Sequence, residues 1–301
     1  MAGSSGSADN PIGSFLRARR EQVRPEDVGL PDYGRRRVPG LRREELAMLA
    51  GVSADYYVRL EQGRDQHPSE QVVDALARAL QLDDDAAAHL HELTRPAPRS
   101  RRRRPARVER VRPGLVAMMA QFTNNPAFIL GRRMDVLAAN ELSLALNPRC
   151  APPTNLVRSL FLEETYAREL YPEYEDVAVE TVATLRASVG ADLDDPALTD
   201  LIGELSLKSE RFRKLWARHD VRDKTDGTKS YMHPLVGPLE LHYETFSING
   251  ADGQMLAVYH AEPGSPSAQA LALLSSMAAS PPSDPRPRPS DRASAPARPD
   301  R

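Results

Sequence analysis

An arginine-rich stretch at residues 95–112 limits how this chain can fold. Its sequence, RPAPRSRRRRPARVERVR, holds nine Arg, three Pro and a single acid. Such a segment has too few apolar side chains to pack a core, and its composition is typical of a solvated linker between domains. We therefore expect the 301 residues to form two folded units, one on each side of this stretch.

The domain boundaries follow from this break and from a second one near residue 281. Residues 281–301 contain seven Pro and almost no apolar side chain, which predicts a disordered tail. We expect a flexible N-terminus at 1–10, a first unit at 11–94 and a linker at 95–113. A second unit is expected at 114–265, followed at 266–301 by a terminal helix and the disordered tail.

Composition and charge exclude several classes of protein. No run reaches 18 apolar residues, and the first residues, MAGSSGSADNPIGS, do not resemble a secretory signal. The single cysteine, Cys150, rules out an internal disulfide framework and a cysteine-based zinc site. We expect a cytoplasmic protein with no membrane partner. Residues 1–113 carry 21 Arg against 17 acids, whereas the rest carries 19 basic residues against 25 acids.

The first unit is predicted to be all helical. Apolar spacing indicates helices from Ile12 to about Val23 and over 41–50, 54–62, 69–80 and 83–93. Residues 29–40, rich in Pro and Gly, are expected to form a loop. Gly51 should end the second helix in a left-handed conformation, and Ser53 should cap the third.

The second and third of these helices form a predicted helix-turn-helix. Ala47 is small where the third helix must cross, and Val52 and Leu60 are expected to fill the space between the two helices. The face of helix 54–62 that points outward would fit the major groove of DNA, with its N-terminal residues nearest the base edges. That face carries Ala54, Asp55, Val58, Arg59 and Gln62.

Individual DNA contacts can be predicted from residue type. Arg59 is the best candidate to contact a guanine, although a salt bridge with Asp55 is an equally good interpretation. Tyr57 and Leu60 are expected in the core, and Tyr56 could lie in the core or near a phosphate. Arginines 99–104 could reach DNA, but a solvated linker is the simpler interpretation. The candidate DNA-contacting residues, including those expected at phosphates, are Arg42, Arg43, Ser53, Ala54, Asp55, Tyr56, Val58, Arg59, Gln62 and Arg64.

The second unit has the pattern of an α+β domain with an antiparallel sheet. Short strands are expected at 127–130 and 134–138, and helices at 115–122, 140–146, 156–170, 178–189 and 196–218. A meander of strands at 227–235, 239–248 and 254–260 follows. Strands followed by helices and then by more strands favour this fold class.

Several motifs resemble a known group of regulators. LRREELAMLAGVSADYYVRLEQGR is similar to the core of XRE-type, phage-repressor-like helix-turn-helix regulators. GRRRVPGLRREE, GRRMDVLAAN and WARHDV resemble the subgroup that carries an MmyB-like ligand-binding domain. The resemblance extends over about residues 11–262. It implies a PAS-like fold for the second unit, with a cavity between sheet and helices for an apolar, fatty-acid-like molecule.

Candidate ligand contacts come from the alternation of apolar residues and from the WARHDV motif. Leu239, Leu241 and Tyr243 alternate onto one sheet face, and Ala138 is expected on the same face as Val136. Trp216 and His219 could hold a head group at the cavity mouth, or could simply end a helix. An apolar sheet face can also be plain core. The candidate set is Phe128, Leu130, Val136, Ala138, Trp216, His219, Leu239, Leu241, Tyr243, Leu256 and Val258.

No motif for catalysis, metal binding or a cofactor stands out. The chain lacks the nucleophile-elbow and nucleotide-binding patterns. His233, His242 and His260 lie on three predicted strands and could converge, but the His-x-His of metal-binding cupins is absent. We therefore expect a homodimeric transcription regulator that binds operator DNA and senses a small molecule. The alternatives are a DNA-binding module fused to an enzymatic or cupin-like domain, and an interaction protein that does not bind DNA.

Overall fold

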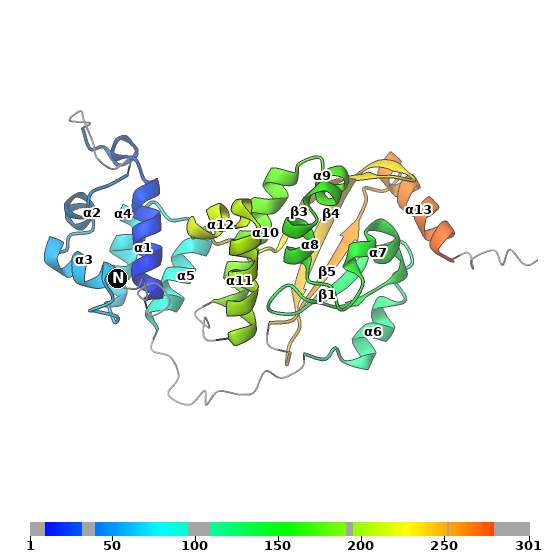
Figure 1. Ribbon diagram of the computed structural model, residues 1–301, viewed down its shortest axis with the longest axis horizontal. Helices are drawn as coiled ribbons and strands as arrows, with labels where there is room; N and C mark the ends of the chain where they lie inside the picture. Colours follow the sequence, from blue (N-terminus) through cyan, green and yellow to red (C-terminus); the bar gives the residue numbers. More distant parts are fainter. Residues whose placement is uncertain (1–9, 32–39, 96–108, 191–194, 252, 280–301) are drawn as a thin grey trace, which may run out of the picture.

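A helical region and an α+β domain lie end to end along the molecule (Figure 1). The computed structural model describes residues 10–31, 40–95, 109–190, 195–251 and 253–279. The predictions for residues 1–9, for most of the linker and for the tail at 280–301 fall outside the described residues. So does most of the predicted loop at 29–40.

The five predicted helices of the first unit are confirmed. Between α2 and α3, Gly51 is left-handed with φ +67, and Ser53 Oγ accepts the N–H of Tyr56 at 3.1 Å, as expected. Tyr57 and Leu60 are fully buried, which confirms their place in the core. The elements are α1 (Pro11–Gln22), the 3-10 helix η1 (Pro25–Val28), α2 (Arg43–Leu49), α3 (Ala54–Glu61), α4 (Glu70–Ala79) and α5 (Asp84–Thr94).

A buried carboxylate joins the first three helices of this region. Glu61, at the end of α3, has a fully buried side chain, and Arg43 of α2 lies 2.7 Å from it. Arg20 of α1, itself buried, donates to Glu61 at 3.1 Å, and Arg17 does so at 3.3 Å. Burial would raise the pKa of Glu61, but the guanidinium groups of Arg43 and Arg20 outweigh it and hold that pKa below its ordinary value.

The second unit is an α+β domain built on one antiparallel sheet, as predicted. Its five strands have the order β2-β1-β5-β4-β3. The strands are β1 (Ala127–Leu130), β2 (Val136–Ala139), β3 (Asp226–His233), β4 (Gly237–Ser247) and β5 (Met255–His260). The helices are α6 (Pro113–Met119), α7 (Glu141–Leu146), the 3-10 helix η2 (Pro148–Cys150), α8 (Leu156–Leu162), α9 (Glu164–Leu170), α10 (Tyr174–Val189), α11 (Pro196–Lys208), α12 (Glu210–Ala217) and α13 (Pro266–Ala279).

Two predicted long helices are each divided in two. The prediction of one helix over 156–170 is wrong because Glu163 leaves helical geometry between α8 and α9, with φ −114 and ψ 46. The helix expected over 196–218 is interrupted at Ser209, whose extended backbone lets its hydroxyl cap α12 by accepting the N–H of Phe212. Helical periodicity continues across both breaks, so the spacing of apolar residues could not reveal them.

The two faces of the sheet pack against different partners. One face joins helices α7 to α12 in the main core, which includes Phe128, Leu239 and Tyr259. The other packs a smaller cluster around Ile129 and Met119, the latter from α6. The ladder between β1 and β2 is irregular: Ile129 pairs with Ala138, whereas the next residue, Leu130, pairs with Val136. This bulge changes which face the residues of β2 occupy.

We expect Glu61→Gln to destabilise the helical region by about 3–5 kcal/mol, because Arg20 would remain buried without its counter-charge. Hydrogen exchange of α1 and α3 amides in the full chain measures this loss as faster local opening. Glu70→Gln, at an exposed position in the first turn of α4, is the matched control and should change stability by about 0.5 kcal/mol or less. Equal protection in wild type and Glu61→Gln would show that the network contributes little.

Candidate DNA-binding surface and ligand cavity

Helix α3 presents a free face at the end of the molecule farthest from the sheet (Figure 1). Asp55, Arg59 and Gln62 are exposed on it, as is the capping Ser53. Ala54, Tyr56 and Val58 are partly exposed. The structure therefore brings the predicted outward residues together on one accessible surface, in the geometry that a recognition helix requires.

Arg59 is positioned by an aromatic ring rather than by a carboxylate. Its guanidinium carbon lies 5.6 Å from the ring centroid of Tyr56. The alternative of a salt bridge with Asp55 is not realised between these two described residues. Tyr56 is thus partly exposed and supports Arg59, which leaves the guanidinium hydrogens free for an external acceptor.

The arginines expected at phosphates differ in their freedom. Arg42 and Arg64 are exposed at the start of α2 and after the end of α3. Arg43 has a half-exposed side chain, but its guanidinium is bound to Glu61 through two nitrogen atoms, at 3.0 and 2.7 Å. Sequence reasoning did not assign this role to Arg43 because the partner lies 18 residues away, at the end of the next helix.

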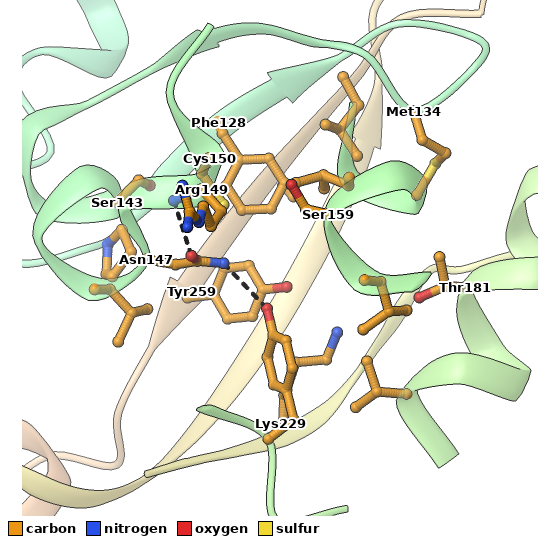
Figure 2. A pocket seen from close by; sticks show the side chains of 18 of the residues that line it. Phe128, Met134, Ser143, Asn147, Arg149, Cys150, Ser159, Thr181, Lys229 and Tyr259 are labelled. Atoms are coloured by element: carbon orange, nitrogen blue, oxygen red, sulfur yellow. Dashed lines mark hydrogen bonds between the residues drawn. The ribbon is translucent and has the colours of Figure 1, made fainter. Parts of the chain in front are cut away.

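An apolar cavity lies between the sheet and helices α7 to α10 (Figure 2). Its volume is about 80 Å³, several times the ~10–15 Å³ that one water molecule needs on the same measure. Strands β1, β3 and β5 contribute Phe128, Leu130, Tyr231, Ala257 and Tyr259. Figure 2 shows Lys229 and Tyr259 on the sheet side and Ser159 and Thr181 on the helix side.

Polar groups are spaced around this apolar wall. Asn147 is held between two tyrosines: it accepts from Tyr166 Oη at 3.0 Å and donates to Tyr171 Oη at 3.2 Å. The hydroxyl of Ser159 is buried and has no hydrogen-bond partner. Burial raises the pKa of the Cys150 thiol to about 12, so this cavity residue is an uncharged thiol at neutral pH. The cavity therefore offers an unpaired polar atom within a mostly apolar surface.

Two lysines separate the apolar cavity from a larger polar one. Lys224, Lys229 and Val177 line both, and the polar cavity measures about 520 Å³. The lysine side chains are only 10% and 9% exposed, and they lie 3.5 and 3.9 Å from Glu180 of α10. Burial, reinforced by the neighbouring Lys229, lowers the pKa of Lys224 well below its ordinary value. Sequence analysis missed this wall, although the chain has only four lysines, and these two are five residues apart.

The predicted ligand-binding residues lie in different parts of the second unit. Phe128 and Leu130 line the apolar cavity as expected. Val136, Leu239 and Leu241 share the core around the cavity but do not line it, and Tyr243 lines the polar cavity instead. Ala138, Leu256 and Val258 pack on the opposite sheet face.

These differences have two physical causes. The bulge in β2 places Ala138 on the face opposite to Val136, against the alternation of a regular strand. In β5 the residues on both faces of the strand are apolar. The alternate set Met255, Ala257 and Tyr259 faces the cavity. Because both faces of this strand are covered, the pattern of apolar residues could not show which alternate set of side chains faces the helices.

Trp216 and His219 do not stand at the cavity mouth. His219 follows α12 with φ +56, and its ring contacts Phe15 of the helical region, with 6.4 Å between centroids. Arg186 of α10 lies over the Trp216 ring at 3.8 Å and contacts His219 Nδ1 at 3.2 Å. Burial and the nearby Arg186 lower the pKa of His219 to about 3. His219 therefore belongs to the junction between the two units, whereas the Trp216 ring stacks on Phe212 and packs against the core of the second unit.

The three strand histidines do not converge. His242 and His260 are cross-strand partners, with ring centroids 5.3 Å apart. His233 lies at the far end of β3, where Nε2 contacts the carbonyl oxygen of Ala145 at 3.0 Å. Among the described residues, no group of three or more His, Cys, Asp or Glu side chains could hold a metal ion. No helix in that part of the chain is long and apolar enough to cross a membrane.

Comparisons with known proteins agree with this geometry. Residues 11–90 match a helix-turn-helix domain, and residues 111–274 match the family described as MmyB-like transcription regulator ligand binding domain. A search of curated proteins finds no match to the chain. The second match extends over more than half of the 301 residues, and it follows a helix-turn-helix region with an exposed α3. The chain therefore belongs to the MmyB-like family of ligand-responsive, DNA-binding transcription regulators.

Proposed function

We propose that the protein binds operator DNA through α3 and that a fatty-acid-like molecule in the apolar cavity alters this binding. The observation that carries the proposal is the combination of an accessible α3 face with an apolar cavity in the second unit. We further propose a homodimer, because two helix-turn-helix units one helical turn apart would read a palindromic site.

On the DNA side, Arg59 would read a guanine through its O6 and N7 atoms. Asp55, Gln62, Val58 and Ala54 would face neighbouring base edges or sugars. Ser53, Tyr56, Arg42 and Arg64 would contact the DNA backbone. Arg43 is proposed to act mainly through Glu61, since its guanidinium is already paired.

On the ligand side, the lysine wall supports an anionic head group. Two lysine side chains lie 3.5 and 3.9 Å from the carboxylate of Glu180, at the edge of an apolar cavity. The acids near the lysines line the polar cavity, whereas the described residues that line the apolar cavity include Arg149, Lys224 and Lys229 and no acid. An anion on the apolar side would therefore favour the protonated form of Lys224. A carboxylate with an apolar chain would satisfy both the wall and the cavity. This arrangement favours a fatty-acid-like ligand over a neutral hydrocarbon.

The DNA roles predict different effects for two arginines. On a site selected from a random library, Arg59→Ala should cost about 1–3 kcal/mol of binding and relax the preference at one base pair. Arg64→Ala should weaken binding to all sequences alike and reduce the salt slope by about one, because it removes a phosphate contact. Fluorescence anisotropy at several salt concentrations measures both. Equal losses on specific and random DNA for Arg59→Ala would contradict base readout.

The cavity predicts that added volume is tolerated on one sheet face only. Ala257→Leu lies beside open space, so it should cost under about 1 kcal/mol while reducing binding of decanoate. Ala138→Leu makes the same change against the packed cluster on the other face and should cost about 1–3 kcal/mol without loss of decanoate binding. Thermal unfolding and isothermal titration measure the two effects. Similar destabilisation by both variants would show that the cavity is a filled core.

The lysine wall predicts selectivity between acid and alcohol. Lys224→Met should weaken decanoate binding at least tenfold, because a charge-assisted hydrogen bond is worth about 1.5–3 kcal/mol. Binding of decanol, which has the same chain without the charge, should change less than twofold. Lys208→Met, at an exposed lysine paired with Glu204 on α11, is the control. If Lys224→Met weakens both ligands equally, the head group lies elsewhere.

A further inference from the structure

The segment Arg218–Thr225, here called the strap, connects α12 to β3 and contacts both units of the molecule. Residues 218–221 and Asp223 contact the helical region, whereas Arg222 and Lys224 contact the ligand-binding domain. Its contacts suggest how the cavity and the DNA-binding helices are linked.

At its start the strap is held by the helical region. Gln22 Nε2 donates to the carbonyl oxygen of Arg218 at 2.6 Å, and Arg19 lies 3.1 Å from Asp220. Val221 is 7% exposed and packs into the core of the helical region itself. At Asp223 the backbone N–H donates to Asp85 of α5 at 3.0 Å. The strap is thus part of the packing of α1 and α5.

Three residues after Val221, the strap forms the wall of the ligand cavity. Lys224 lies between the two cavities, 3.5 Å from Glu180 and 4.0 Å from the centroid of the Tyr243 ring. Its carbonyl oxygen accepts from Thr245 Oγ1, and Thr245 also lines the apolar cavity. Lys224 follows Val221 by only three residues, so a shift of the Lys224 backbone would also displace Val221 or change the backbone dihedral angles between them.

Helix α10 connects the same two places. Its middle carries Val177, Glu180 and Thr181 at the cavities, and two turns later Arg186 is buried at the junction. Arg186 NH2 donates to the carbonyl oxygen of Trp216 at 2.5 Å, which fixes the residues just before the strap. The backbone N–H of Arg222 also meets the carbonyl oxygen of Ala183 at 3.4 Å. Cavity, strap and helical region therefore share a rigid support.

We propose that the strap transmits occupancy of the apolar cavity to the DNA-binding region by changing how that region docks on the ligand-binding domain. The proposal rests on the proposed function, in which an anionic head group meets Lys224. The anion would compete with Glu180 for Lys224, so the docked and undocked arrangements would bind it with different affinity. That difference is what a ligand needs to shift an equilibrium between two states.

Hydrogen exchange of the full chain with and without decanoate tests the strap directly. In wild type, saturating decanoate should change exchange rates at least threefold in residues 218–225 and in the facing parts of α1 and α5. The double variant Asp220→Ala, Val221→Ala removes two contacts with the helical region. It should keep decanoate affinity within about twofold, measured by titration, while α1 and α5 no longer respond.

A matched control and distinct outcomes separate this inference from the proposed function. Arg168→Ala breaks ion pairs with Glu164 and Glu175 on the ligand-binding domain alone and should leave the response intact. If decanoate binds but the strap, α1 and α5 do not respond, the strap inference is wrong and the ligand proposal stands. If decanoate does not bind, the ligand proposal fails, and the strap inference is then tested by hydrogen exchange of the Lys224→Met variant. Exchange rates in α1 and α5 equal to those of the wild type would overturn the strap inference.

Discussion

The geometry of the DNA-binding region depends on one buried carboxylate. Glu61 ends α3, and its charge is balanced by Arg20 of α1 and Arg43 of α2. A buried ion pair contributes little net stability compared with apolar packing, but loss of one partner is costly because the other stays buried and charged. The network therefore acts as a constraint on arrangement: α3 can be presented to DNA only when α1 and α2 stand in their correct places.

The second unit contains a comparable cluster, in which two lysines lie close to one carboxylate. Lys224 and Lys229 lie between an apolar cavity and a polar one, with Glu180 at 3.5 and 3.9 Å and further acids such as Glu173 and Asp226 lining the polar cavity. In the proposed function this cluster accepts the head group of an anionic ligand from the apolar cavity. Lys224 lies between the two cavities, three residues after Val221, which packs into the core of the helical region. This proximity is the physical basis of the proposed link between ligand binding and domain arrangement.

Much of the fold could be predicted because local physics determined it. Apolar spacing, Gly51 and Ser53 defined the helices of the first unit and the turn between α2 and α3. Alternation and turn residues predicted the order of strands and helices in the second unit. The predictions failed at Glu163 and Ser209, where a helix is interrupted although the helical spacing of apolar residues continues. This spacing shows which residues are apolar, but it does not show where the helical hydrogen bonds stop.

The sequence by itself determined the two-unit organisation, the helix-turn-helix with Arg59 on its outward face, and the α+β class of the second unit. Tertiary structure alone decided which side chains surround the cavity. A bulge in β2 places Ala138 on the sheet face opposite to the cavity. Because both faces of β5 are covered, the sequence did not show that the alternate set containing Ala257 faces the cavity. Tertiary structure also placed His219 beside Phe15, 204 positions apart in the sequence, and Lys224 beside Glu180. Such contacts depend on how whole elements pack, and pairing between distant residues leaves no periodic signal in a single sequence.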